Sequence, residues 1–207
     1  IPSLFLSLAT AIIVTRVTTS ESMTEQATTQ LSNVPALFIA AGILTLLGLV
    51  PGMPHLGSGI SWLRDGRRVV ASTNLKDAQV SVIDMQNWQT LATIPTLGPG
   101  FFLRSHEKSP YAWVDSMMSP TARDTLQVID KQQMKVVAQV REPGKTFAHV
   151  EFDRYGRYVI ASLMEKDGAL IFLDASTFKE IKRLPASKPI GKYNLFNKIQ
   201  RSEGTSH

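Results

Sequence analysis

The sequence of 207 residues contains no cysteine. Disulfides, thiolate metal sites and the C-x-x-C-H attachment of a c-type haem are therefore excluded. Two other patterns are also missing, namely the G-x-S-x-G turn that presents a nucleophilic serine and the Gly-rich loop with lysine that holds phosphate. Serine hydrolases built on that turn and P-loop nucleotide-binding proteins are excluded by these absences.

Charged residues are scarce in the first quarter of the chain. Residues 1–56 contain one basic residue, Arg16, and two acidic residues, Glu21 and Glu25, whereas 21 Lys and Arg and 15 Asp and Glu follow position 56. The net charge of +5 therefore comes from residues 57–207, which carry +6 against −1 in residues 1–56. Because the basic residues are spread along this part rather than gathered into one stripe, we expect no nucleic acid partner.

Residues 1–56 contain two apolar runs. Residues 35–53 carry no charge over nineteen positions, about the length that a helix needs to cross a bilayer. We predict a membrane segment with helices at about 1–15 and 34–53. A soluble core helix is the alternative, although such helices normally carry a polar stripe. Arg16 favours a cytoplasmic loop between the helices, so we expect residues 57–207 on the periplasmic side of a bacterial inner membrane.

The same residues carry a family resemblance. IPSLFLSLATAIIVTRV, together with LLGLVPGMPHL, resembles the FHIPEP family, the multi-span inner-membrane export-gate proteins of flagellar and type III secretion systems. In that family the turn that matches Pro51–Pro54 joins two late membrane helices. The resemblance covers about residues 1–56, and the large cytoplasmic domain of the family does not follow. It implies either a part in protein export or only a passive membrane anchor.

Residues 57–207 repeat with a period near 45 residues. LRDGRRVVAS (63–72) returns as FDRYGRYVIAS (152–162), with KSPYAWVDS (108–116) as a looser copy between them. Each copy leads to a second strand that ends in aspartate, and these residues, Asp84, Asp130 and Asp174, lie 46 and 44 positions apart. A third strand follows each aspartate, at 88–94, 134–140 and 178–184.

A period of 40 to 50 residues with about four short strands is typical of a β-propeller blade. We therefore predict an all-β fold for residues 57–207, with about three four-stranded blades. Trp62 and Trp113 are expected to pack between blades, and the strand-ending aspartates to form side-chain hydrogen bonds within turns. Propellers close with four to eight blades, so we expect further blades upstream or from a second copy.

The residues of this part carry a second resemblance. GPGFFLRSHEKSPYAWVDSMMS, FAHVEFDRYGRYVIASLMEKDGALIFLDASTFKEIKRL and KPIGKYNLFNKIQRSEGTSH resemble the C-terminal part of the haem d1 propeller family. That family includes cytochrome cd-type nitrite reductase and two proteins of haem d1 biosynthesis, NirF and NirN. The resemblance implies an eight-bladed propeller that holds haem d1 in a central channel, in the denitrification pathway. The ending of the chain and A-H-V-E-F favour the biosynthetic branch.

The resemblance also implies candidate site residues. Haem d1 needs an imidazole for iron, basic groups for its carboxylates and apolar walls. His149 is the first candidate for a metal ligand or catalytic proton donor, and the alternative is a hydrogen-bonded strand-end histidine. His106 and Arg104 follow Gly98 and Gly100, which would allow close approach to a flat ligand. Arg104 would then bind a carboxylate, and His106 would contact the cofactor or support the site.

A third group of candidates is Lys192, Tyr193 and Asn194, which would line the cofactor pocket or close the last blade. The expected partners are a tetrapyrrole, the membrane through residues 1–56, and nitrite reductase or other proteins of the haem d1 pathway. Oxidoreductase activity is left open, and the chain alone is expected to be inactive.

Three hypotheses follow from the sequence. The first is a haem d1 binding or maturation protein behind a membrane segment. The second is a part of a FHIPEP-type export component. The third is an artificial join of two coding regions near Gly57, which long-read sequencing across codons 50–65 would test.

Overall fold

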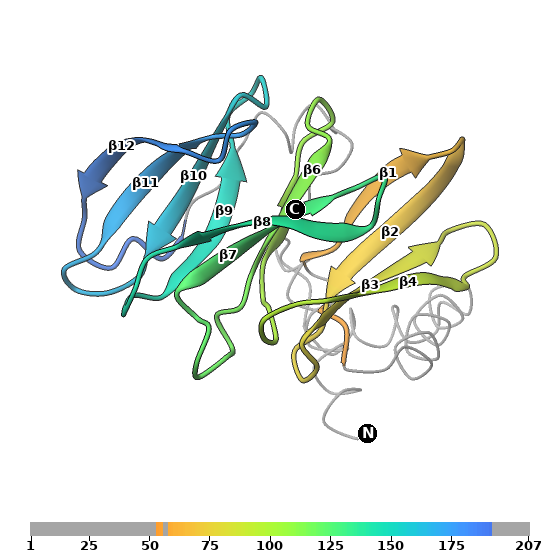
Figure 1. The fold of residues 1–207 in the computed structure, drawn as a ribbon, viewed down its shortest axis with the longest axis horizontal. Helices are drawn as coiled ribbons and strands as arrows, with labels where there is room; N and C mark the ends of the chain where they lie inside the picture. Colours follow the sequence, from red (N-terminus) through yellow and green to blue (C-terminus); the bar gives the residue numbers. More distant parts are fainter. Residues whose placement is uncertain (1–52, 56–57, 192–207) are drawn as a thin grey trace, which may run out of the picture. The chain divides into compact units, whose positions relative to one another are not determined.

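The structure is a computed structural model that describes residues 53–55 and 58–191. These residues form three antiparallel four-stranded sheets, which follow one another in the chain (Figure 1). The all-β prediction for residues 57–207 is thereby confirmed, and three such sheets are consistent with part of a propeller. The helices predicted at 1–15 and 34–53 lie outside the described residues except for Met53. Within the described ranges, no helix is long and apolar enough to cross a membrane.

The strands alternate with short turns. The first sheet contains β1 (Ile60–Arg64), β2 (Arg67–Thr73), β3 (Gln79–Asp84) and β4 (Thr90–Pro95). The second contains β5 (Leu103–Ser105), β6 (Tyr111–Asp115), β7 (Thr125–Asp130) and β8 (Lys135–Arg141). The third contains β9 (Phe147–Phe152), β10 (Tyr158–Leu163), β11 (Ala169–Asp174) and β12 (Glu180–Pro185). The strands predicted to end at Asp84, Asp130 and Asp174 are β3, β7 and β11. Those predicted at 88–94, 134–140 and 178–184 are β4, β8 and β12, whose bounds agree to within two residues.

The repeat extends to the hydrogen bonds of the turns. The carboxylates of Asp84, Asp130 and Asp174 each accept a backbone N–H two residues further on, at 2.7, 2.9 and 2.9 Å. The residue four positions after each aspartate has a positive φ, between 52° and 64°. The register then shifts by one residue in the third and fourth strands of every sheet. The turn role predicted for these aspartates is therefore confirmed.

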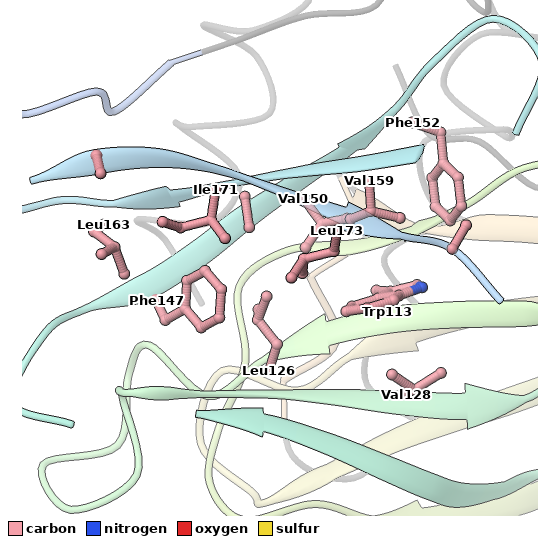
Figure 2. Packing of buried hydrophobic residues seen from close by; sticks show 13 residues of the cluster. Trp113, Leu126, Val128, Phe147, Val150, Phe152, Val159, Leu163, Ile171 and Leu173 are labelled. Carbon is pink, nitrogen blue, oxygen red and sulfur yellow. The ribbon is translucent and has the colours of Figure 1, made fainter. Parts of the chain in front are cut away.

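Two apolar clusters join neighbouring sheets. One combines side chains of the first and second sheets around Trp62, and the other combines the second and third sheets around Trp113 (Figure 2). Both tryptophans are buried, at 5% and 0% exposed, as predicted. Fully burying a large apolar side chain contributes about 1.5–3 kcal/mol, so these interfaces hold the sheets together.

The edges of the sheets position the site. The first strand of the second sheet, β5, lies beside both β1 and β9, and the fourth strands β4 and β8 lie beside one another. In contrast, all six residues of β12 are exposed. No described residues form a further sheet against the third one, so closure into an eight-bladed ring stays a prediction.

Candidate functional site

Four aromatic rings lie against one another where β5 and β9 are adjacent. The ring centroids of His55 and Phe101 are 4.0 Å apart, those of Phe101 and Phe102 4.8 Å, and those of Phe102 and His149 4.3 Å. We call these four residues the ring cluster. Phe101 and Phe102 directly precede β5, and His149 lies within β9. Because Phe101 and Phe102 are only partly buried, the cluster offers an aromatic surface to a flat ligand.

His149 has an unusual backbone for a strand residue. Its φ is +55°, and the register between β9 and β10 shifts beside it. A β-bulge of this kind turns a side chain out of its regular direction, and a non-glycine residue at positive φ is held there by its surroundings. The fold therefore maintains a strained conformation at His149, and both roles given for it above stay predictions.

A hydrogen bond fixes the tautomer of His149. Its Nδ1 lies 2.7 Å from the carbonyl oxygen of Ile190, and a carbonyl can only accept, so Nδ1 carries the proton. In the neutral ring the lone pair is then on Nε2, the form in which imidazole binds a metal. The donor chemistry of His149 therefore fits a ligand for the iron of a tetrapyrrole, and Phe102 beside it would form an apolar wall.

Arg104 lies in β5 and is completely enclosed, at 1% exposed. Its Nε donates to Glu151 Oε1 at 3.2 Å, and its Nη1 donates to the carbonyl of Leu103 at 3.0 Å. Its guanidinium carbon also lies 5.5 Å from the ring centre of Phe102. Arg104 thus joins β5 to β9 and supports Phe102. The predicted contact with a ligand carboxylate stays a prediction, and Glu151 already balances the charge of Arg104.

The two glycines before β5 serve the protein's own packing. A Cβ on Gly100 would lie 2.4 Å from the carbonyl oxygen of Asp115, and one on Gly98 would lie 2.3 Å from Ser119 Cβ. The expectation that they allow a ligand to approach is therefore corrected, because the chain itself fills that space. Their absence of side chains lets the segment that carries Phe101 and Phe102 lie directly against the end of β6.

His106 lies at the opposite end of β5 from Phe102. It is fully buried, and its Nδ1 accepts a hydrogen bond from the backbone N–H of Lys108 at 3.1 Å. The turn after β9 packs on its ring. Burial lowers the pKa of His106, although the nearby carboxylates of Glu107 and Asp153 act in the opposite direction. The structure does not bring His106 and His149 together, and it favours the supporting role for His106.

The remaining candidates Lys192, Tyr193 and Asn194 lie outside the described residues. Conversely, sequence reasoning missed three residues of the site, namely His55, Glu151 and Asp115. His55 Nδ1 lies 2.8 Å from the carbonyl oxygen of Phe101, and the Asp115 carboxylate binds the backbone of the ring cluster. The F-F pair between the glycines and Arg104 was the available signal for an aromatic surface.

Comparison with known proteins identifies the family. The family model described as Cytochrome D1 heme domain matches residues 33–198. The dihydro-heme d1 dehydrogenase of Pseudomonas aeruginosa is 54% identical over 157 residues, which cover 75% of this chain and 32% of that protein. A solved structure of dihydro-heme d1 dehydrogenase NirN in complex with DHE matches with a TM-score of 0.70 and 52% identity, over 72% of this chain and 32% of that one. The chain thus spans about a third of the length of these relatives.

A second similarity confirms the other resemblance. The flagellar biosynthesis protein FlhA of Proteus mirabilis is 54% identical over 56 residues, which are 27% of this chain and 8% of that protein. The similarity to FlhA is therefore confined to a short segment, whereas the cytochrome D1 match spans most of the chain.

Proposed function

We propose, from the premise that this chain belongs to the cytochrome D1 heme domain family, that it binds haem d1 or its dihydro form and acts in the maturation of this cofactor for denitrification. The identity of 54% to a dihydro-heme d1 dehydrogenase supports this branch of the family. The proposal concerns only the part of such a protein that this chain supplies, namely its three four-stranded sheets.

The ring cluster is the observation that carries the proposal. A tetrapyrrole is a flat aromatic ligand with a central iron, and it binds where aromatic faces lie beside an imidazole. Phe102 and His149 meet at a centroid distance of 4.3 Å, and the tautomer of His149 leaves the lone pair on Nε2. Bound iron would supply the redox chemistry, while His149 and Phe102 would hold the macrocycle in place.

Titration of the full chain with haem d1 tests the proposal. We expect a shifted Soret band at micromolar cofactor, which His149→Ala weakens by at least about tenfold in affinity. His106→Gln is the matched control, because this histidine lies at the other end of β5, outside the ring cluster, and its replacement should lower the affinity far less than His149→Ala does. Circular dichroism confirms that both variants are folded. No spectral change in the unmodified chain would refute the proposal, and loss of the shift only in His106→Gln would reverse the assignment.

The location is part of the same proposal. We place the three sheets in the periplasm of a bacterium, anchored to the inner membrane by residues 1–56, with nitrite reductase or other proteins of the haem d1 pathway as partners. The charge-free run at 35–53 supports the anchor. Membrane fractionation and a C-terminal alkaline phosphatase fusion would test this location, since alkaline phosphatase is active only in the periplasm. A soluble or inactive fusion contradicts this location.

The FlhA similarity favours a second candidate, a role in flagellar protein export. Expression of the full chain in a strain that lacks its export-gate protein tests this role directly. Restored motility would support it. We expect no restoration, because the matched segment is only 8% of that relative.

A further inference from the structure

A buried carboxylate lies behind the ring cluster. Asp115 ends β6 and is 1% exposed. Its Oδ1 accepts hydrogen bonds from the backbone N–H of Phe101 at 2.8 Å and of Met117 at 3.2 Å, and its Oδ2 accepts from the backbone N–H of Phe102 at 3.0 Å. One side chain therefore binds the backbone of both phenylalanines of the ring cluster, and the centroid of the Phe102 ring lies 4.3 Å from that of the His149 ring.

These bonds order a segment that packs on the third sheet. Phe101 and Phe102 lead into β5 of the second sheet, whereas His149, which the Phe102 ring contacts, belongs to β9 of the third. A carboxylate suits this position because its two oxygens offer about four acceptor sites and no donor. An asparagine would offer one oxygen, and its NH2 group would face a backbone N–H. This position therefore requires an ionised carboxylate. No neutral side chain of the same size offers two acceptor oxygens and no donor.

The surroundings leave little freedom for this arrangement. Gly100 brings the Phe101–Phe102 segment so close that a Cβ there would lie 2.4 Å from the Asp115 carbonyl oxygen. His149 adopts a φ of +55° at a β-bulge, a conformation that costs about 1–3 kcal/mol unless the surroundings hold it. The hydrogen bond of its Nδ1 to the Ile190 carbonyl and the contact with the Phe102 ring are contacts that can hold it.

We propose that Asp115 is a positioning residue for the tetrapyrrole, which fixes the Phe101–Phe102 segment and thereby the placement of the Phe102 ring beside His149, without touching the ligand. This inference rests on the proposed function for the identity of the ligand. Its geometric part, the ordering of the Phe101 and Phe102 backbone, stands on the hydrogen bonds alone. The two parts are therefore separable by experiment.

The test compares Asp115→Asn with Asp124→Asn in the full chain. Asp124 is a matched carboxylate, 7% exposed and bonded to Thr125 and Arg141, and it is not bonded to the ring cluster. In Asp115→Asn we expect faster hydrogen exchange at the amides of Phe101 and Phe102, haem d1 affinity lower by about tenfold, and a displaced Soret maximum. Asp124→Asn should leave the Soret maximum and the affinity unchanged, because general destabilisation does not alter the placement of the ligand.

A second variant covers the case in which Asp115→Asn fails to fold. Gly100→Ala keeps the carboxylate but pushes the Phe101–Phe102 segment away from it, so the exchange and Soret changes should recur. Unchanged amide exchange in the folded variants would overturn the inference, as would binding with unchanged affinity and an unchanged Soret maximum. If the unmodified chain binds no haem d1, the proposed function fails, and the exchange measurement still decides the role of Asp115.

Discussion

Replacing Gly156 with alanine probes how the second and third sheets fit together. Gly156 lies in the turn between β9 and β10 with a φ of +72°. A Cβ there would lie 2.5 Å from Nδ1 and 2.9 Å from Cγ of His106. The His106 ring is fully buried, and Lys108 holds it by a hydrogen bond, so it has little room to move away.

Gly66 provides the matched control. It occupies the corresponding turn of the first sheet with a φ of +76°, but a Cβ there would have no atom within 4 Å. An alanine in left-handed conformation costs about 1–2 kcal/mol, and forcing extra atoms into a packed interior costs about 1–3 kcal/mol more. We therefore expect Gly66→Ala to lower the free energy of unfolding by about 1–2 kcal/mol. Gly156→Ala should lower it by about 2–5 kcal/mol.

Urea unfolding of the full chain, followed by tryptophan fluorescence and far-ultraviolet circular dichroism, measures both values. The double variant Gly156→Ala with His106→Ala isolates the contact. In the His106→Ala background, the added cost of Gly156→Ala should fall to that of Gly66→Ala. Equal destabilisation by the two glycine replacements in the unmodified background would refute the reasoning, because it would show that the His106 ring does not press on this turn.

Two further predictions concern packing and pH. Trp113→Ala should lower the free energy of unfolding by about 3–5 kcal/mol, because it removes the largest side chain of the cluster between the second and third sheets. Trp88 is 52% exposed, so Trp88→Ala should change that free energy by less than about 0.5 kcal/mol. Similar urea midpoints for the two variants would contradict this prediction. Hydrogen bonds from the Ser176 hydroxyl and the backbone of Thr177 and Ser176 lower the pKa of Asp174 to about 2, so its carboxylate stabilises the fold above the ordinary pKa of about 4. The stability difference between the unmodified chain and Asp174→Ala should therefore be small at pH 7, given the exposure of the site, and should shrink between pH 4 and pH 2; a difference that grows in acid would contradict the assignment.

The sequence by itself predicted the strands and their repeat. Alternating β-branched residues and the recurrence of Asp84, Asp130 and Asp174 depend on local rules, because a strand buries alternate side chains and an aspartate after a strand binds the next backbone N–H groups. The interblade positions of Trp62 and Trp113 followed from the same periodicity. The family resemblance also depended on local residue patterns, and it was confirmed over residues 33–198.

Tertiary structure alone decided the site. Both His106 and His149 are candidates in the sequence and both are buried, at 0% and 3% exposed, yet one lies at the far end of β5 and the other in the ring cluster. The role of Asp115 could not be predicted, because the ring-cluster N–H groups that it binds are 13 and 14 positions away in the chain, and the Phe102 ring contacts His149 of another sheet. Such contacts depend on how two sheets pack, and no local pattern encodes that packing. The sequence therefore determined which residues form strands and turns, while the packing of the sheets determined which of them meet at the site.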